Sequence, residues 1–338
     1  MTPFLSICVM TYNRVGTLRE TLDSILPQVV GNPEIEVLVS DNASADNTGD
    51  VVRDYCSRYP NLRYSRNPTN VDFDGNVVAC INNAAGEYVA YFSDDDLATP
   101  GMVAGLFNGL KETRPIAAYI NHTAFFQDDP KKLGSDTQPR LKRLFTNPTE
   151  YFLYTGLGFI SALTLKRSEA LKHIPSATMG RGTAHVEIAS RVVLSSQGPF
   201  WFDGTITVLG RYEENSRYDV LRCGLMNTSQ VHLDLFHEGL LTQADVDWHN
   251  RKTIRLFLMR LIVNNRLNGR KLVLASELRA MYGRDPLFYL GPYPLTLIPA
   301  PLLRMVGNPA RDIMRRCRRW MLAHGKTPPA VRHLVPPS

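Results

Sequence analysis

Short apolar runs alternate with stretches of helical periodicity along the N-terminal third of the chain. Four runs predict buried strands: Leu5 to Met10, Ile35 to Val39, Leu62 to Tyr64 and Tyr88 to Phe92. Three groups of apolar residues at helical spacing predict intervening helices: Leu18, Leu22, Ile25 and Leu26; Val51, Val52 and Tyr55; Val77, Val78 and Ile81. Strands that alternate with helices form right-handed crossover units. We therefore expect an α/β fold with a mostly parallel sheet flanked by helices.

Three consecutive aspartates, Asp94, Asp95 and Asp96, come just after the fourth predicted strand. Carboxylates placed side by side repel one another unless a cation neutralises them. Ligands of open α/β sheets collect at the carboxyl ends of the strands. The triplet therefore predicts a metal or phosphate site, and a solvated acidic turn is the simpler alternative.

The loop after the first predicted strand lacks the glycine-rich signatures of nucleotide-binding loops. Thr11 to Gly16 contains a single glycine instead of GxGxxG, and the chain has no Walker A motif. A diphosphate would therefore be held by a metal ion or by cationic side chains.

Composition is that of a folded protein from a reducing compartment. The 338 residues are 44% hydrophobic and 21% charged, which is typical of a chain with a substantial core. The five cysteines are scattered without CxxC spacing, so we expect neither a disulfide framework nor a zinc site. The N-terminus enters the first predicted strand without a basic and apolar leader, and we therefore expect a cytoplasmic protein.

Three segments, taken in order, resemble the motifs of the family-2 glycosyltransferases: Ser6 to Arg14, Val37 to Thr48 and Gly86 to Asp96. The resemblance is strongest to bacterial enzymes of O-antigen and surface-polysaccharide synthesis. It implies the GT-A fold, which is Rossmann-like, and a nucleotide-sugar donor. It also implies a nucleotide-sugar-binding half over residues 1–115 and an acceptor-binding half over residues 116–240. Residues 241–338, which the resemblance matches only loosely, form a third region that we expect to be helical, basic and membrane-associated.

The family pattern implies nucleotide contacts at the ends of the first two strands. Thr11, Tyr12 and Arg14 fall where the nucleotide packs, and the ring of Tyr12 offers a flat apolar face to a base. Asp41 resembles the aspartate that accepts a hydrogen bond from the base, or it forms an Asx-turn that caps the next helix. Three asparagines lie in the segment that the family uses near the ribose and phosphates, or act as turn and cap residues: Asn67, Asn70 and Asn76.

Within the acidic triplet, Ser93, Asp94 and Asp95 resemble the Thr-Asp-Asp variant of the family's metal-binding motif. The resemblance implies that Asp95 is a ligand of a divalent cation and that Asp94 contacts the ribose or the metal. Asp96 would lie behind them. Oxygen ligands and a diphosphate suit Mg²⁺ or Mn²⁺, and the sequence does not distinguish the two.

The family's reaction is a displacement at the anomeric carbon, by default with inversion, and it needs a base for the acceptor hydroxyl. The predicted helix before Arg191 offers Glu187, which has the usual chemistry, and His185, which lies closer to the usual spacing from Arg191. Each residue also has an ordinary structural role, Glu187 as a first-turn acid and His185 as a capping or packing residue.

Two arginines follow the strand predicted for Trp201 to Leu209. Arg211 and Arg217 are candidates for clamping the diphosphate, or they are solvated loop charges.

Basic charge is concentrated in the C-terminal region. Residues 241–338 hold 17 Lys and Arg against five Asp and Glu, a net charge of +12 in a chain whose total is +6. A helical stretch over 241–283 is expected to pack on the catalytic body. The segment from Leu287 to Leu303 is apolar but contains four prolines, so a regular spanning helix is excluded.

The spacing from Ala310 to Leu322 predicts an amphipathic basic helix, with Ile313, Cys317 and Trp320 on one face and five arginines largely elsewhere. We expect it to bind an anionic membrane surface, where each arginine contributes on the order of 1 kcal/mol. We do not expect nucleic acid as a partner, because no reading module accompanies the charge. A plain structural helix is the other alternative.

The resemblance and the basic tail together predict a glycosyltransferase that is peripheral at the inner face of the cell membrane. It would move a sugar from a nucleoside-diphosphate donor to a lipid-linked or polysaccharide acceptor. A sugar nucleotidyltransferase is the alternative enzyme, although that class uses a glycine-rich N-terminal loop. A non-catalytic module that binds a nucleotide-sugar or a glycan is the alternative outside enzymes.

Overall fold

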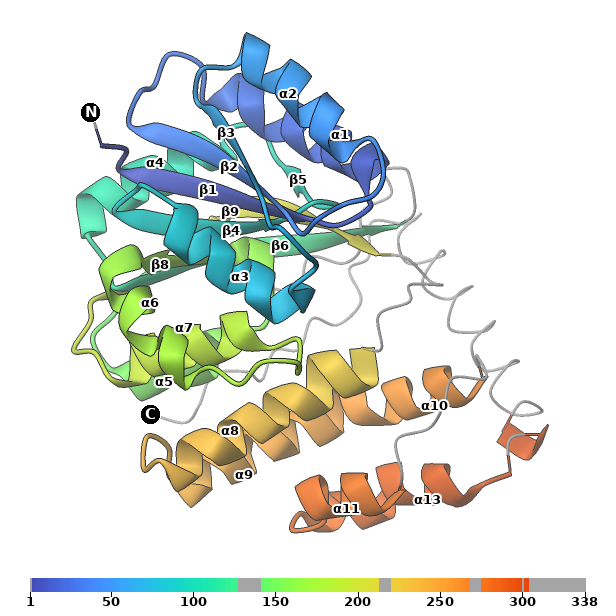
Figure 1. Ribbon diagram of the computed structural model, residues 1–338. Helices are drawn as coiled ribbons and strands as arrows, with labels where there is room; N and C mark the ends of the chain where they lie inside the picture. The colour runs from blue at the N-terminus through green and yellow to red at the C-terminus, as the bar shows by residue number, and fades with distance from the viewer. Residues whose placement is uncertain (1, 127–140, 213–219, 268–274, 300, 304–338) are drawn as a thin grey trace, which may run out of the picture. The chain divides into compact units, whose positions relative to one another are not determined.

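The computed structural model describes residues 2–126, 141–212, 220–267, 275–299 and 301–303. The chain divides into two compact units, Met1–Ser216 and Arg217–Ser338, which are described separately. The first unit contains all the described strands, and the second is helical (Figure 1).

The strands of the first unit form one nine-stranded sheet with the order β3-β2-β1-β4-β8-β6-β9-β5, and β7 pairs with β9. Their bounds are β1 (Leu5–Thr11), β2 (Ile35–Asp41), β3 (Leu62–Arg66), β4 (Tyr88–Ser93), β5 (Leu97–Ala98), β6 (Ala117–Phe126), β7 (Lys142–Phe145), β8 (Leu163–Lys166) and β9 (Phe200–Tyr212). The four strands predicted in the N-terminal third are confirmed. β1 and β2 are buried along their whole length, which is why they read as continuous apolar runs.

The sheet is parallel in its first half and mixed in its second. β3, β2, β1 and β4 run parallel, as the alternation of strands and helices predicts. β8 runs antiparallel to both β4 and β6, and β9 runs parallel to β6 but antiparallel to β5 and β7. The parallel arrangement therefore covers the nucleotide-binding half that the motifs predict.

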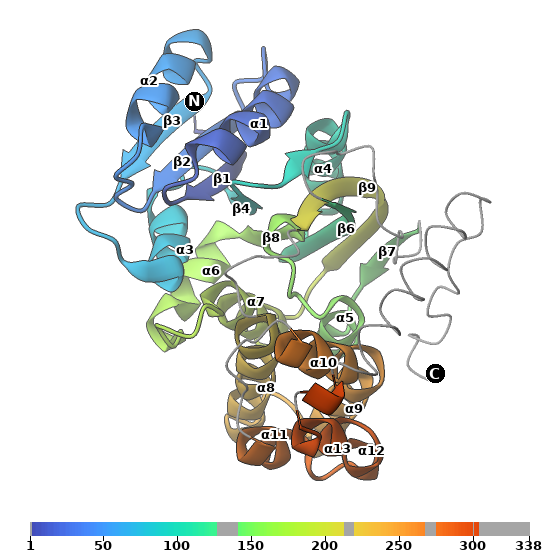
Figure 2. The ribbon, with the colours of Figure 1, turned by 90° about the vertical axis from the view of Figure 1, so that its right-hand side faces the viewer.

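Helices cover both faces of the sheet. Their bounds are α1 (Val15–Ile25), α2 (Thr48–Arg58), α3 (Asp72–Asn83), α4 (Met102–Thr113), α5 (Pro148–Thr155), α6 (Arg167–His173) and α7 (Ala184–Leu194), with 3-10 turns η1 (Leu26–Gln28), η2 (Ile160–Ala162) and η3 (Ile174–Ser176). α1 and α2 lie on one face, and α3, α6 and α7 on the other (Figures 1 and 2). Most of the apolar residues predicted for α1, α2 and α3 are buried, with Val78 of α3 only partly so. These helices also bury polar side chains, such as Thr21 of α1 and Asp74 of α3.

The second unit is a set of helices around its own core. Their bounds are α8 (Asn227–His237), α9 (Gln243–Thr253), α10 (Met259–Leu267), α11 (Ala275–Tyr282), α12 (Pro286–Leu290) and α13 (Pro292–Leu297), with π-helical segments η4 (Val220–Met226) and η5 (Ile254–Leu258). Leu258, Ile262, Leu278 and Phe288 are fully buried in the core. None of the described helices is both long and apolar enough to cross a bilayer. The predicted helix from Ala310 to Leu322 lies outside the described residues.

Candidate active site

The carboxyl ends of β1, β2 and β4 bring the predicted nucleotide and metal residues to one edge of the sheet. Thr11 at the end of β1 is paired in register with Asp41 at the end of β2. On its other side β1 pairs Met10 with Ser93, directly before the aspartate triplet. Tyr12 follows β1 and is 44% exposed, so its ring is available to a ligand. Parallel pairing is the reason that residues distant in sequence meet here.

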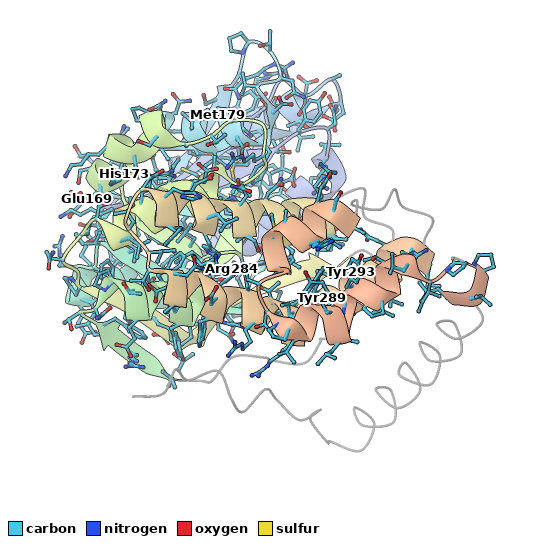
Figure 3. The ribbon with its side chains drawn as sticks, turned by 90° about the horizontal axis from the view of Figure 1, so that it is seen from below. Glu169, His173, Met179, Arg284, Tyr289 and Tyr293 are labelled. Atoms are coloured by element: carbon cyan, nitrogen blue, oxygen red, sulfur yellow. The ribbon has the colours of Figure 1, made fainter. Side chains whose placement is uncertain are left out.

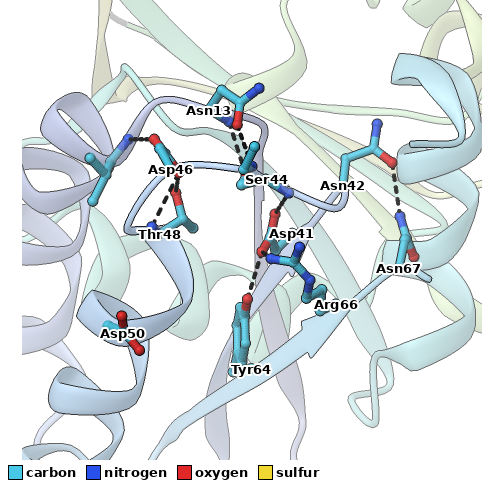
Figure 4. Close-up of polar contacts among 12 residues, drawn as sticks. Asn13, Asp41, Asn42, Ser44, Asp46, Thr48, Asp50, Tyr64, Arg66 and Asn67 are labelled. Atoms are coloured by element: carbon cyan, nitrogen blue, oxygen red, sulfur yellow. Dashed lines mark hydrogen bonds and ion pairs between the residues drawn. The ribbon is translucent and has the colours of Figure 1, made fainter. Parts of the chain in front are cut away.

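Asp41 is fully buried and holds three protein donors (Figure 4). Its Oδ1 accepts a hydrogen bond from the backbone amide of Ser44 at 2.8 Å. This contact is the one expected if Asp41 forms an Asx-turn before α2. Its Oδ2 accepts from Tyr64 Oη at 2.6 Å and from Arg66 Nη1 at 3.0 Å. A carboxylate offers about four acceptor positions, so these contacts leave capacity for a further donor.

An amide network fastens the segment between β3 and α3 to the end of β2. Asn67 Nδ2 donates to Asn42 Oδ1 at 3.1 Å (Figure 4). It also donates to Asn76 Oδ1 at 3.1 Å. Asn76 is buried and also bonds with the hydroxyl and carbonyl of Ser40, while Asn42 donates to Asn70. These contacts correspond to the turn and cap roles that were one alternative for Asn67, Asn70 and Asn76.

Arg14 bridges the first two aspartates of the triplet. Its Nη1 lies 3.3 Å from Asp94 Oδ1 and 2.9 Å from Asp95 Oδ2. Burial raises the pKa of Asp94 to about 6, although the neighbouring Arg14 charge opposes this shift. Ser93 Oγ donates to the other oxygen of Asp95 at 2.6 Å. The repulsion inferred from the sequence is therefore relieved here by a guanidinium.

Asp96 faces inward and joins three segments of the fold. Its Oδ2 accepts from Ser161 Oγ of η2, and its Oδ1 accepts from the backbone amide of Arg211 at 3.0 Å. Its carbonyl accepts from Thr21 of α1 at 2.8 Å. Burial, with the nearby Asp95 charge, raises the pKa of Asp96 to about 8. Asp96 thus joins the acidic loop to α1, η2 and β9.

Arg211, a residue of β9, contacts the same acidic loop. Its Nε donates to the Asp95 carbonyl at 3.1 Å, its guanidinium pairs with Glu20, and its side chain is only 3% exposed. This burial rules out a solvated loop position for Arg211. Arg217 lies outside the described residues.

The helix that carries both base candidates, α7, is held at its first turn by a residue of α3. Asp74 is buried, and its carboxylate accepts from the backbone amides of Gly182 and Ala184 at 2.8 and 2.9 Å. Gly182 has a φ of +72°, which glycine adopts without strain. The contact satisfies amides at the N-terminus of α7 from another element instead of from the chain before it.

The carboxylate of Glu187 is surrounded by hydrogen-bond donors from the loop before α7 and from α7 itself. It is 1% exposed and accepts from the Thr178 amide at 2.8 Å and from Arg191 Nη1 at 3.3 Å. Arg181 adds an ion pair at 3.8 Å, and the Thr183 hydroxyl a hydrogen bond at 3.3 Å. Glu187 therefore ties the loop before α7 to the helix.

The surroundings of His185 differ from those of Glu187. It is 6% exposed, its Nε2 lies 3.4 Å from the carbonyl oxygen of Gly158, and the edge of its ring meets that of Phe73. Because a carbonyl only accepts, this contact favours the tautomer with the proton on Nε2. Nδ1 is then an acceptor, and it has no hydrogen-bond partner among the described residues. Burial lowers the pKa of His185 to about 4, so the imidazole is neutral at neutral pH.

A short segment connects His185 to the acidic loop. Gly158, whose carbonyl contacts His185, lies three residues before Ser161, which donates to Asp96 and accepts from the Ser93 amide at 2.9 Å. Three residues span at most about 11 Å. The segment 158–161, called the bridge below, therefore contacts the His185 imidazole at one end and the acidic loop at the other.

Comparison with known proteins identifies the family. The family model described as "Glycosyl transferase family 2" matches residues 6–174, half of the chain. This chain belongs to glycosyltransferase family 2. The match contains β1, β2 and β4 together with the residues at their carboxyl ends, as the three motifs predict.

Relatives of this family-2 chain include enzymes of bacterial glycan synthesis. Abequosyltransferase RfbV of Salmonella typhimurium is 39% identical over 93 residues, which cover 27% of this chain and 28% of that protein. The GalNAc(5)-diNAcBac-PP-undecaprenol beta-1,3-glucosyltransferase of Campylobacter jejuni is 31% identical over 116 residues, which cover 32% of this chain and 35% of that protein. The alignments thus cover about a third, or less, of the length of these relatives.

Solved structures share the fold over most of the chain. TarS of S. aureus, residues 1–349 in complex with UDP-GlcNAc, has a TM-score of 0.57 and 18% identity, and the match covers 96% of this chain and 92% of that one. The mannosyltransferase PcManGT of Pyrobaculum calidifontis, in complex with GDP-Man and Mn²⁺, has a TM-score of 0.52 and 16% identity, with coverage of 90% and 87%. At such identities the likeness concerns the fold alone, and it confirms the GT-A fold.

The acidic loop of this family-2 chain offers two carboxylates to a metal. The described residues contain no cluster of three or more His, Cys, Asp or Glu side chains able to hold an ion. Mg²⁺ and Mn²⁺ at nucleotide sites usually take one or two carboxylates and complete their shell with phosphate and water. Asp94 Oδ1 and Asp95 Oδ2 already converge on one cationic nitrogen. The oxygens present therefore fit a divalent ion that arrives with a diphosphate.

A groove at the opposite edge of the sheet does not belong to this site. It has a volume of about 530 Å³ and lies at the amino ends of β1 and β4. Four of the charged residues that line it form local ion pairs, Lys111 with Glu34 and Arg114 with Glu87. Arg167, which also lines it, donates to the carbonyls of Ile81 and Asn82. The cleft of a parallel sheet is expected at the carboxyl ends instead.

Three residues of the family-2 site escaped the sequence analysis. Arg66 pairs with Asp41, Asn42 links the asparagines, and Asp74 holds the start of α7. Arg66 ends β3, so the rule that assigned Asp41 to the carboxyl edge could also have assigned Arg66 there. Asp74 and its partners are separated by more than 100 residues, and no local pattern joins them.

Proposed function

We propose that this chain transfers a sugar from a nucleoside-diphosphate donor to a lipid-linked or polysaccharide acceptor in bacterial surface-glycan synthesis. The observation that carries the proposal is the convergence of Asp41, Asp94 and Asp95 at the carboxyl edge of a GT-A sheet. Complexes of fold neighbours with UDP-GlcNAc and with GDP-Man and Mn²⁺ support the donor class.

The donor contacts follow from the positions at this edge. The exposed ring of Tyr12 stacks on the base, and Asp41 accepts a hydrogen bond from it beside Thr11. Asn67 and Asn76 hold the loop near the ribose through their amide network. Arg211 steadies the acidic loop from β9, and Arg217 is proposed to meet the diphosphate.

Asp95 and Asp94 are proposed to hold Mg²⁺ or Mn²⁺. When bound, the ion would supply positive charge at the departing nucleoside diphosphate. The proposal is supported by two carboxylate oxygens that share one cationic nitrogen, and by the Mn²⁺ complex of the fold neighbour.

His185 is favoured over Glu187 as the base. The acceptor oxygen forms a bond to the anomeric carbon while the bond from that carbon to the diphosphate breaks, and Nδ1 of His185 takes the hydroxyl proton. Its buried Nδ1 is an acceptor without a described partner, whereas the Glu187 carboxylate is bound by Arg191 and the Thr178 amide. Attack from the face opposite the leaving group gives inversion.

The acceptor class rests on the relatives. The Salmonella relative is named an abequosyltransferase, and the Campylobacter relative acts on an undecaprenol-linked glycan according to its name. A lipid-linked acceptor requires access to a membrane, which the basic C-terminal region would provide.

We propose that two parts of the C-terminal region contact the inner face of the cell membrane. One is the helix predicted for residues 310–322, and the other is an apolar surface of the second unit. Exposed apolar side chains occur on α12, α13 and beyond: Tyr289, Leu290, Leu297 and Leu302, of which Leu290 is 80% exposed. Tyr289 and Tyr293 are in contact, with ring centroids 5.6 Å apart, and lie on the same unit as Arg284 (Figure 3). The described residues of 251–303 include seven Lys and Arg but two Asp and Glu, so an anionic bilayer would complement the charge of this unit.

Vesicle binding tests the membrane contact. The full chain should cosediment with anionic vesicles at low salt and not with neutral ones, and Leu290→Glu should weaken that binding several-fold. Equal cosedimentation with both kinds of vesicle, or none with either, would remove the proposal.

Donor turnover tests the proposed function. The protein should be stabilised thermally by one member of a nucleotide-sugar panel, and more strongly with Mn²⁺. It should then release the nucleoside diphosphate slowly, and Asp95→Asn should abolish the release, while Asp50→Asn on exposed α2 should not. Binding without turnover on any acceptor would favour the non-catalytic module instead.

A further inference from the structure

Arg14 contacts one oxygen of each of the two carboxylates proposed to bind a divalent ion. One nitrogen, Nη1, lies within 3.3 Å of both Asp94 Oδ1 and Asp95 Oδ2. Two cations repel each other, so a guanidinium in contact with both carboxylates opposes the binding of a divalent ion there. Binding of a metal by Asp94 and Asp95 is therefore favoured when the guanidinium moves away.

The backbone on both sides of Arg14 is fixed to the loop after β2. The Asn13 amide donates to Ser44 Oγ at 2.9 Å, and Asn13 Oδ1 accepts from the Ala45 amide at 2.6 Å. The Val15 amide donates to Asp46 Oδ2 at 3.1 Å (Figure 4). Because these bonds hold the chain before and after Arg14, a rearrangement is confined to its side chain.

The exposure of the Arg14 side chain leaves room for such a movement. It is 47% exposed, whereas the side chain of Asp94 is 5% exposed. Rotation about its side-chain bonds moves the guanidinium by several ångströms while the loop stays in place. The guanidinium is also a preferred partner of phosphate oxygens, to which it can donate two parallel hydrogen bonds.

We propose that Arg14 is a built-in counter-ion for the acidic loop that exchanges partners when the donor binds. Before binding, it neutralises Asp94 and Asp95 and keeps the loop ordered. When a divalent ion arrives with the diphosphate, Arg14 leaves the carboxylates and donates to the diphosphate oxygens. This inference rests on the proposed function, because it concerns the same ion and the same diphosphate.

The exchange predicts effects of opposite sign on two ligands. Arg14→Gln removes the competitor, so Mn²⁺ alone should bind about tenfold more tightly than to the wild-type chain. At saturating Mn²⁺ the same variant lacks a phosphate partner, so a nucleoside diphosphate should bind about tenfold more weakly. A tenfold change corresponds to about 1.4 kcal/mol, which a single charge-assisted hydrogen bond can account for.

The measurement is calorimetric titration of the full chain with MnCl2, confirmed by the loss of the free Mn²⁺ signal in electron paramagnetic resonance. A second titration uses uridine, guanosine, cytidine and thymidine diphosphates at saturating Mn²⁺. Neither readout depends on turnover.

Two further variants separate charge from packing. Arg14→Lys keeps the positive charge and should bind Mn²⁺ within about twofold of the wild type. Arg53→Gln breaks a comparable pair on the exposed face of α2, where Arg53 lies 2.6 Å from Asp50, and should change neither affinity.

The inference is overturned if Arg14→Gln binds Mn²⁺ as the wild type does or more weakly, or if Arg14→Lys gains as much affinity as Arg14→Gln. In either case donor turnover by the wild-type chain would leave the proposed function standing. A wild-type chain that binds no nucleoside diphosphate in any titration would instead count against the proposed function itself.

Discussion

The Asp74 carboxylate accepts a hydrogen bond from the backbone amide of Ala184, 110 residues further along the chain, at 2.9 Å. Asp74 belongs to α3, on the donor side of the fold, and Ala184 opens the helix that carries His185. The bond therefore fixes the start of α7 relative to α3. If His185 is the base, Asp74 would be a positioning residue, because it would act through the helix and not on a substrate.

Replacement of Asp74 should disturb both stability and the position of His185. We expect Asp74→Asn to lower the free energy of unfolding by about 2 kcal/mol, because an amide nitrogen then faces a buried backbone donor. We also expect kcat to fall at least tenfold with little change in the KM for the donor. Asp72→Asn, at an exposed residue of the same helix turn, is the matched control for urea unfolding and kinetics. Equal behaviour of the two variants would contradict the positioning role.

Substitutions of the two base candidates should have different effects on kcat and on the free energy of unfolding. His185→Asn should lower kcat by a factor of about 10² to 10⁴, with a small effect on unfolding. Glu187→Gln leaves Arg181 and Arg191 without their buried counter-charge and should cost about 3 kcal/mol of stability.

Urea denaturation and single-turnover kinetics of both variants decide between the candidates. A variant Glu187→Gln that folds normally but has lost turnover would transfer the role of base to Glu187.

Acid should loosen the contact between α8 and α9. The rings of His232 and His249 lie 3.8 Å apart, and burial lowers the pKa of His232 to about 3 and that of His249 well below its usual value. Below the unfolded pKa of about 6.5 the unfolded segment binds more protons than the folded one. Stability is therefore full above pH 6.5 and declines as the pH falls, by up to about 1.4 kcal/mol per pH unit for each histidine.

Hydrogen exchange between pH 7 and pH 5, corrected for the intrinsic rate, measures this opening in peptides from residues 231–253. Peptides from residues 275–290 contain no histidine and should keep their protection. Loss of protection in both sets, or in neither, would contradict the assignment to the histidine pair.

Two glycines in helices of the first unit should respond oppositely to alanine. A Cβ added at Gly109 in α4 would overlap the Trp201 indole, whereas one added at Gly16 in α1 meets nothing within 4 Å. We expect Gly109→Ala to destabilise by about 1 to 3 kcal/mol through overpacking. Gly16→Ala should stabilise by about 0.4 to 1 kcal/mol, because it restricts the unfolded chain. Thermal unfolding followed by circular dichroism gives both signs, and a neutral Gly109→Ala would show that α4 can retreat from β9.

Much of the donor half could be predicted from sequence because its strands are continuous and apolar. Buried parallel strands such as β1 and β4 leave little ambiguity, and the rule for their carboxyl ends places Asp41 beside Thr11 and Arg14 near Asp95. β7 was not predicted, because Lys142–Phe145 is short and largely exposed. The antiparallel course of β8 is also invisible to a pattern of apolar residues, which gives the period of a strand but not its direction.

The second half of the site depends on contacts that no local pattern carries. In the sequence, spacing favoured His185 and chemistry favoured Glu187, and the difference between them lies in the residues that surround each side chain. Arg181 and the Thr178 amide reach Glu187 because the preceding loop folds back over α7. Likewise, Ser161 meets Asp96 through packing across 65 residues.

The bridge from Gly158 to Ser161 has a consequence for evolution of the enzyme. One end touches the imidazole proposed to handle the incoming sugar hydroxyl, and the other end touches the loop proposed to handle the outgoing nucleotide. A lineage that changes its acceptor by reshaping this bridge would also alter its handling of the donor. New linkages should therefore arise more readily from substitutions elsewhere along α5 or α7, where one substrate can be exchanged without disturbing the other.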